Sequence, residues 1–238
     1  MAVNNTLAPK KDEITAVFNA NGKEVKLTPT MVKRFLVSGD ANNVTFEEVS
    51  MFINLCKYNG LNPWLKEAYL IKFGTNPATL VVGKEAYLKR AESHNQYDGA
   101  ESGVIVLTND RIVYRTGTVT LDGEQIIGGW AEVFRKDRSH STRCEVSFKE
   151  YAGYSKDGKL NRQWNAKPAT MIRKVALVQA LREAFPTIFG GMYTAEEQGY
   201  VEEDTAVEVP ANPAEVQVVE KQEQQVQPEA NAGDGLPL

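Results

Sequence analysis

The sequence predicts an α+β fold in which an antiparallel β-meander packs with helices and is followed by a disordered acidic tail. Several segments carry apolar residues at helical spacing between capping and stop signals. Others are β-branched runs separated by residue pairs that are typical of hairpin turns. Beyond Tyr200 the chain has no aromatic residue and no sustained period, so it has too little apolar surface to offset the entropy lost on ordering.

Capping signals indicate two helices in the N-terminal part of the chain. Thr28-Pro29 supplies a cap and a first-turn proline, and Gly39 ends this segment. Thr45 and Glu48 form a capping box, after which apolar residues recur at helical spacing until Asn59-Gly60. We therefore expect one helix in each of these two segments.

Past the second helix the period changes from helical to alternating. Residues 66–73 alternate in a way that predicts a strand, with one face that carries Lys66 and Lys72. A second short strand is expected at residues 79–82. Residues 84–93 then have the pattern of a helix.

Residues 103–148 predict the meander. Asn109-Asp110 and Asp122-Gly123 lie between β-branched runs and indicate hairpin turns, so we expect an antiparallel sheet. Its strands are expected at residues 104–107, 111–121, 125–135 and 142–148.

A long helix is expected to follow the meander. It begins near Pro168 and ends before Pro186, with an apolar stripe at helical spacing. The stripe consists of Met171, Ile172, Val175, Val178, Leu181 and Phe185. The remaining face of this helix includes Arg173 and Lys174.

Charge is distributed unevenly along the chain. Residues 135–182 contain twelve Lys and Arg against four Asp and Glu, although the whole chain has a formal charge of −4. Residues 1–194 hold 26 basic and 20 acidic residues, whereas residues 195–238 hold 1 and 11. Such asymmetry is typical of a polyanion-binding body with an acidic appendage. The alternative is a solvated charged face, but few acidic neighbours are present to pair with these cations.

The sequence gives little support for an enzyme. The nucleotide-binding loop pattern is absent, and His94 and His140 have no companion at metal-ligand spacing. Cys56 and Cys144 are expected to be buried free thiols in a reducing compartment. We therefore expect no catalytic residues, no metal and no cofactor. No run of about twenty apolar residues indicates a membrane span, so we expect a soluble intracellular protein.

Five segments together resemble the phage single-strand annealing proteins of the Redβ/RecT superfamily, particularly the phage recombination protein Bet group. They are residues 58–67, which contain GLNPW, then 82–84, 97–99, 134–138, which contain RKDR, and 164–174. The resemblance covers roughly residues 40–195. It implies a non-catalytic, ATP-independent recombinase with a Rad52-like annealing core that forms rings or helical filaments. It also implies partners: single-stranded and annealed DNA, a phage exonuclease and a host single-strand-binding protein, in the cytoplasm of a bacterial host.

The resemblance and the basic cluster together predict a DNA-binding groove that contacts phosphates. The resemblance assigns Lys66, Lys136, Arg138, Arg173 and Lys174 to the groove, and Lys149 and Lys156 to a basic connection beside it. The basic cluster adds Arg135 and Lys167.

We expect three regions: an N-terminal arm (1–25), a DNA-binding and oligomerisation core (26–195) and the acidic tail (196–238). A metal-dependent DNA nuclease and a non-catalytic phage scaffold protein remain as alternatives.

Overall fold

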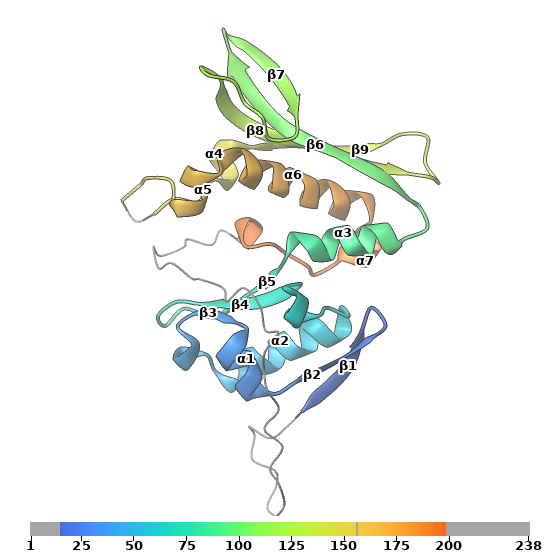
Figure 1. Ribbon diagram of the computed structural model, residues 1–238, viewed down its shortest axis with the longest axis vertical. Helices are drawn as coiled ribbons and strands as arrows, with labels where there is room; N and C mark the ends of the chain where they lie inside the picture. Colours follow the sequence, from blue (N-terminus) through green and yellow to red (C-terminus); the bar gives the residue numbers. More distant parts are fainter. Residues whose placement is uncertain (1–14, 156, 199–238) are drawn as a thin grey trace, which may run out of the picture. The chain divides into compact units, whose positions relative to one another are not determined.

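Strands and helices occur largely in separate runs along the chain: four consecutive strands at residues 97–147 are followed by four helices at residues 148–189, as expected for an α+β protein (Figure 1). The computed structural model describes residues 15–155 and 157–198, all within one unit of residues 1–207. The expected acidic tail lies outside the described residues from residue 199 onward. The mixed fold class and its antiparallel sheets are confirmed.

The described part opens with a hairpin of β1 (Ala16–Ala20) and β2 (Lys23–Leu27). Asn21-Gly22 joins the two strands with φ values of 51° and 79°, a conformation that Asn and Gly tolerate best. Phe18 and Val25 are buried in the core. The hairpin thus crosses the boundary expected between residues 25 and 26, and part of the expected arm packs as core.

Both predicted N-terminal helices are confirmed. Helix α1 (Pro29–Phe35) begins after Thr28, whose Oγ1 accepts from Met31 N at 3.1 Å. Helix α2 (Phe46–Tyr58) begins at the predicted capping box, in which Thr45 and Glu48 exchange hydrogen bonds of 3.2 and 2.9 Å. The strand β3 (Val37–Gly39) and a 3₁₀ turn, η2 (Ala41–Asn43), connect these helices.

A three-stranded sheet follows, with the order β3-β4-β5. Strand β4 (Ala68–Lys72) pairs parallel to β3 and antiparallel to β5 (Thr79–Val82). The expected lysine-bearing face is wrong, because Lys66 lies before β4, after the 3₁₀ turn η3 (Pro63–Leu65). The side chain of Lys72 is only 5% exposed and its Nζ lies 2.8 Å from Glu48 Oε1.

The Glu48–Lys72 ion pair makes stability depend on pH. Burial alone would raise the pKa of Glu48, but hydrogen bonds from Lys72, Ala78 N and Thr45 N outweigh it and hold the pKa below 4.5. A carboxylate with a lowered pKa stabilises the fold above its unfolded pKa, and this contribution is lost as the pH falls through the folded pKa. We expect the free energy of unfolding, measured with urea, to fall below pH 4.5.

Glu48→Gln should remove part of that pH dependence and lower stability at neutral pH, because Lys72 then stays buried without a charged partner. Glu47→Gln is the matched control, since Glu47 is exposed on the same turn of α2. Identical pH profiles for the parent and Glu48→Gln would contradict the assignment.

The antiparallel sheet has four strands in the order β7-β6-β8-β9. They are β6 (Tyr97–Thr108), β7 (Arg111–Thr116), β8 (Gln125–Arg135) and β9 (Thr142–Ser147). The order differs from that of a simple meander, because β8 pairs with β6 and not with β7. Strand β6 also begins earlier than expected: it pairs with β8 from Tyr97 to Leu107, across a register shift after Tyr97, and with β7 from Gly103 to Thr108.

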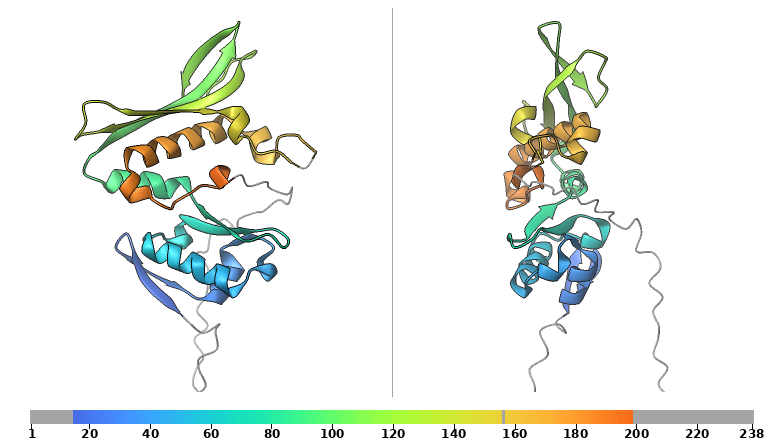
Figure 2. Two further views of the ribbon diagram at one scale, coloured as in Figure 1. Left: turned by 180° about the vertical axis from the view of Figure 1, so that it is seen from behind. Right: turned by 90° about the vertical axis from the view of Figure 1, so that its left-hand side faces the viewer.

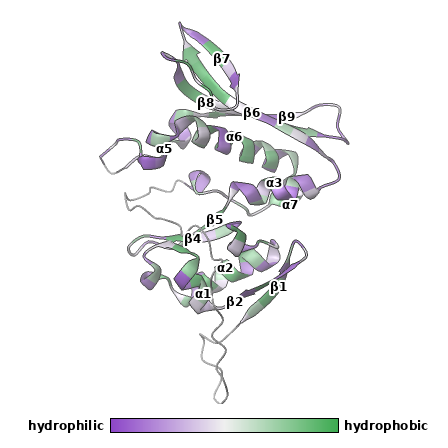
Figure 3. Ribbon diagram, in the orientation of Figure 1, coloured by the Kyte–Doolittle hydropathy of each residue, from purple (hydrophilic) through white to green (hydrophobic). Residues whose placement is uncertain are grey.

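The long predicted helix is confirmed as α6 (Pro168–Ala184), and its apolar stripe is buried. Helix α6 packs against β6, β8 and β9, and also contacts α3 (Lys84–Ser93), so it is enclosed on several sides (Figures 1 and 2). Figure 3 shows hydrophobic residues along much of α6, whereas α3 is largely hydrophilic. Three short helices flank α6: α4 (Phe148–Tyr151), α5 (Arg162–Ala166) and α7 (Pro186–Phe189).

Candidate nucleic-acid interface

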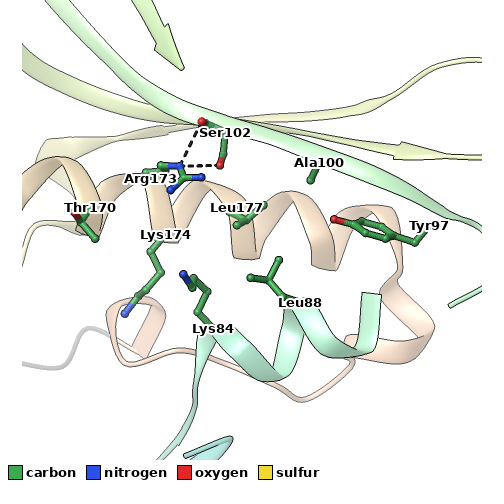
Figure 4. Close-up of a pocket in the computed structure, with 9 residues that line it drawn as sticks. All are labelled: Lys84, Leu88, Tyr97, Ala100, Ser102, Thr170, Arg173, Lys174 and Leu177. Atoms are coloured by element: carbon green, nitrogen blue, oxygen red, sulfur yellow. Dashed lines mark hydrogen bonds between the residues drawn. The ribbon is translucent and has the colours of Figure 1, made fainter. Parts of the chain in front are cut away.

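A cavity of about 220 Å³ lies between β6, α3 and α6 (Figure 4). One side of it is cationic and comprises Lys84, Arg173 and Lys174. The other side is mainly apolar and comprises Leu88, Tyr97, Ala100 and Leu177. A cavity with both characters fits a ligand that has an anionic part and an apolar or aromatic part.

The cationic side begins at the N-terminus of α3. A Cβ on Gly83 would lie 2.6 Å from the carbonyl oxygen of Lys66, so glycine is required for this close approach. Lys66 itself is exposed and has φ of 59°, a strained conformation for a residue with a side chain. The turn that contains GLNPW therefore lies directly against the start of α3, and Lys84 is the first residue of that helix.

Helix α6 supplies the other two cations of the cavity. The Nε of Arg173 donates to Ser102 Oγ at 3.0 Å and to Ser102 O at 3.4 Å, which ties the guanidinium to strand β6 (Figure 4). Lys174 is 26% exposed, and its Nζ lies 2.5 Å from Glu196 Oε1. Both residues lie in the first half of α6, on the part of its surface outside the apolar stripe.

Helix dipoles add to the positive potential. Gly83 before α3 and Lys167 before α6 make no side-chain cap hydrogen bond. First-turn N–H groups without a cap leave partial positive charge at a helix N-terminus. Lys84 in the first turn of α3 is unfavourable for that helix, and its Nζ pairs with the exposed Glu85 at 3.3 Å. An anion in the cavity would offset this repulsion.

Arg135, in contrast, is engaged within the fold. Its Nε and Nη2 donate to the two carboxylate oxygens of Asp137 at 2.9 and 2.7 Å, and its Nη1 donates to Ala184 O. Its guanidinium also lies 4.5 Å from the ring centre of Phe185, and the side chain is 14% exposed. The hydrogen bond that the guanidinium donates to Asp137 raises the pKa of Arg135 above its ordinary value. These contacts position the β8–β9 hairpin against the end of α6.

The other predicted residues that the structure describes are exposed but are not among those that line the cavity. Lys136 and Arg138 are in the β8–β9 turn, near the C-terminal end of α6. Lys149 in α4 and Lys167 lie towards the opposite end of that helix, whose seventeen residues span about 25 Å. Lys156 lies outside the described residues. The structure thus brings Arg173 and Lys174 together with the start of α3, against which the turn of Lys66 lies. The exposed Lys136, Arg138, Lys149 and Lys167 lie towards one end of α6 or the other.

Of the nine residues that line the cavity, the sequence predicted two as site residues, Arg173 and Lys174; those that it did not predict include Lys84, Tyr97 and Ser102. Lys84 had a detectable signal, because a lysine at the first position of a predicted helix opposes the helix dipole. Lys84 and Tyr97 also lie in two of the segments that carry the resemblance, 82–84 and 97–99, whereas Ser102 had no signal, since it becomes a neighbour of Arg173 only through the packing of β6 on α6.

Signs of metal chemistry or membrane insertion are not found in the part of the chain that the structure describes. Over residues 15–155 and 157–198 there is no cluster of three or more His, Cys, Asp or Glu that could hold a metal ion. Within the same residues no helix is both long and apolar enough to cross a bilayer. Cys56 and Cys144 are buried free thiols, as expected, and burial raises the pKa of Cys56 to about 12.

Comparisons with known proteins support the resemblance that the sequence motifs suggested. The chain is 26% identical over 205 residues to the recombination protein bet of Escherichia phage lambda. The aligned region covers 84% of this chain and 68% of that protein. Residues 22–210 match the RecT family, and this range includes every residue that lines the cavity. The chain therefore belongs to the RecT family of phage single-strand annealing proteins.

Proposed function

We propose that this protein anneals complementary DNA strands without ATP and holds single strands by their phosphates along a surface centred on the cavity. The main support is one observation: Lys84, Arg173 and Lys174 come from two different helices and line one cavity, whose other side carries the aromatic ring of Tyr97. Cations near an aromatic side chain are the combination that single-stranded nucleic acid requires.

Phosphate contacts suit annealing better than base contacts do. Contacts to phosphates position a strand without regard to its sequence, whereas contacts to base edges impose a sequence preference. Bases that are left accessible can pair with a second strand. Neutralising the phosphates also reduces repulsion between two strands, so the reaction needs no ATP in principle.

A wider basic surface would extend this contact. Lys136 and Arg138 at one end of α6, and Lys149 and Lys167 towards the other, are exposed and suited to further phosphates. Lys66 adds a cation beside α3. Lys156 stays a prediction, and Arg135 is better explained as the support of the β8–β9 hairpin.

We also propose that the protein self-associates through the edge of its four-stranded sheet. Strand β7 is an edge strand, and the segment that comprises β7 and the loop after it exposes large apolar side chains. These are Ile112, Tyr114, Val119 and Leu121, which are 60%, 47%, 71% and 57% exposed. Unpaired strand edges with exposed apolar residues are typical association surfaces.

Val119→Glu is expected to reduce the size of the assembly, because it places a charge in this apolar surface. Mass photometry of the purified protein, with and without a single-stranded oligonucleotide, measures the effect. Thr118→Glu is the matched control, since Thr118 is exposed next to it and polar already. If Thr118→Glu and Val119→Glu assemble alike, the surface is not an interface.

The proposed function is tested by mixing complementary oligonucleotides with the protein in the absence of ATP and following duplex formation by fluorescence. We expect accelerated annealing that is independent of sequence and weakened by salt. Labelled single strands incubated with magnesium ions test the nuclease alternative in parallel. Cleavage products, or assemblies without any affinity for DNA, would overturn the proposal.

The remaining partners follow from the same role. An annealing protein needs single strands, so we propose that a phage exonuclease supplies them in the cytoplasm of a bacterial host. A host single-strand-binding protein is a second proposed partner. Residues 26–195 are proposed as the DNA-binding and oligomerisation core, and residues 196–238 as an acidic tail.

A further inference from the structure

The end of the described chain packs directly against the basic face of α6. After α7, Tyr193 O accepts from Val82 N at 3.0 Å, and the buried Thr194 leads into the 3₁₀ turn η4 (Glu196–Gln198). Gln198 donates to Leu80 O at 2.9 Å. These contacts hold two adjacent glutamates, Glu196 and Glu197, beside cations of α6.

The carboxylates of the two glutamates differ in how many hydrogen-bond and ion-pair partners they have. Glu197 accepts from Thr194 N at 3.0 Å and from Thr194 Oγ1 at 3.2 Å, and it pairs with Arg182. Its role is therefore structural, because it closes the turn in which it lies. Glu196 has one partner for Oε1, the Nζ of Lys174 at 2.5 Å.

The second oxygen of Glu196 is buried and has no hydrogen-bond partner among the described residues. A buried carboxylate oxygen without a partner is unfavourable, so the site around Glu196 is not optimised for a permanent ion pair. The hydroxyl of Tyr87 is also buried without a hydrogen-bond partner among the described residues. It lies close enough to both glutamates to interact with them electrostatically. Glu196 is consequently the less firmly held of the two acidic residues.

We propose that Glu196 is an exchangeable lock on Lys174: its carboxylate occupies the lysine in the free protein and is displaced by a phosphate of the bound strand. This inference rests on the proposed function, because Lys174 lines the cavity assigned to DNA. The carboxylate and a phosphate oxygen are both anionic acceptors and compete for one ammonium group.

The lock would lower the affinity of the free protein for DNA and make it more selective for continuous strands. One phosphate gains little from Lys174, since Glu196 must first be released. Several phosphates bound at neighbouring cations raise the effective concentration of the next one and shift the exchange towards DNA. Short oligonucleotides and free nucleotides would then leave Lys174 paired with Glu196.

The test compares Glu196→Gln with Glu183→Gln. Both substitutions remove one negative charge, but Glu183 is exposed on α6 and pairs with neither Lys174 nor Arg182 in the described contacts. Binding of a fluorescent thymidine oligonucleotide is measured by anisotropy between about 50 and 200 mM salt. We expect Glu196→Gln to raise affinity about threefold or more and to steepen the salt slope by up to about 0.7, the value for one phosphate contact on a single strand.

A double-mutant cycle with Lys174→Ala identifies the partner. Glu196→Gln should have no effect on affinity when Lys174 is already alanine, because no lock remains to be released. Equal effects of Glu196→Gln and Glu183→Gln, or an effect of Glu196→Gln that persists in the Lys174→Ala protein, would overturn the lock alone. Failure of the parent and of every variant to bind DNA would instead overturn the proposed function.

Discussion

Replacement of both Lys84 and Arg173 with alanine is expected to weaken binding of a single-stranded oligonucleotide by about tenfold or more at physiological salt. The two residues provide cavity cations from separate helices, α3 and α6, so their loss removes the positive charge that each helix contributes at these positions. Each phosphate contact on a single strand contributes about −0.7 to the salt slope, and the double variant should therefore have a slope shallower by about 1.4. Anisotropy titrations over a salt series measure both quantities, and annealing rates should fall with affinity.

The matched control removes the same charge elsewhere. Lys23 in β2 and Lys57 in α2 are exposed, and the Lys23→Ala, Lys57→Ala double variant has the same net charge as the cavity variant. If the two double variants lost affinity equally, binding would depend on overall charge and the cavity would not be the site.

Arg173 also supports β6 through Ser102, so an unfolding curve must accompany each titration. Arg173→Lys separates the two roles, because it keeps the charge but not the geometry of a guanidinium. Retained binding with reduced stability in Arg173→Lys would assign the serine contact to folding and the charge to DNA.

Local signals allowed most elements of the fold to be predicted. Thr28 and the Thr45–Glu48 capping box begin helices where the sequence indicated, and Pro168 begins α6. These signals act within one turn of the helix, so they can be recognised in the sequence without knowledge of distant contacts. Asn21-Gly22 is a signal of the same kind and marks the β1–β2 hairpin, which the sequence analysis left in the N-terminal arm.

Non-local pairing explains what the sequence did not reveal. The pairing of β8 with β6 depends on a register between strands separated by the whole of β7, and no local pattern specifies it. The burial of Lys72 in strand β4 depends on Glu48 in helix α2, which supplies the counter-charge that permits a lysine in the interior. An alternating pattern alone predicts an exposed face for such a lysine.

The candidate site was predictable in part, for a related reason. Arg173 and Lys174 lie off the apolar stripe of a predicted helix, which marks them as residues outside the core. Arg135 was predicted in the groove as part of the basic cluster, but its guanidinium bonds to Asp137 and Ala184. Trp164, which opens the last segment of the resemblance, is buried against Phe148 with ring centres 5.4 Å apart. Composition identifies a basic segment but not which of its side chains face solvent.

Gly129→Ala is expected to have the largest effect on stability. Helix α6 crosses β8 so closely that a Cβ on Gly129 would lie 2.6 Å from the carbonyl oxygen of Ile172 and 2.9 Å from its carbonyl carbon. These are backbone atoms of a buried helix, so they cannot rotate away as a side chain would. Overpacking of this kind lowers the free energy of unfolding by about 1–3 kcal/mol, and by more where the backbone must move. Urea unfolding followed by circular dichroism measures the loss.

Gly190→Ala is the control for Gly129→Ala. Gly190 has φ of −58°, and the nearest atom to an added Cβ is 3.5 Å away, so alanine fits there without strain. It should leave stability unchanged or raise it slightly, by about 0.4–1 kcal/mol, because alanine restricts the unfolded chain. Similar losses at both glycines would show that the close approach of α6 to β8 is not the cause.

Gly129→Ala also tests the link between the core and the proposed DNA surface. Ile172, whose backbone would have to move, directly precedes Arg173 and Lys174, so a shift of α6 away from Gly129 also displaces both cations from β6 and from Ser102. Under conditions in which Gly129→Ala remains folded, its affinity for single-stranded DNA should therefore fall, whereas that of Gly190→Ala should not. A folded Gly129→Ala protein with unaltered affinity would mean that the cations of α6 act without the precise support of strand β6.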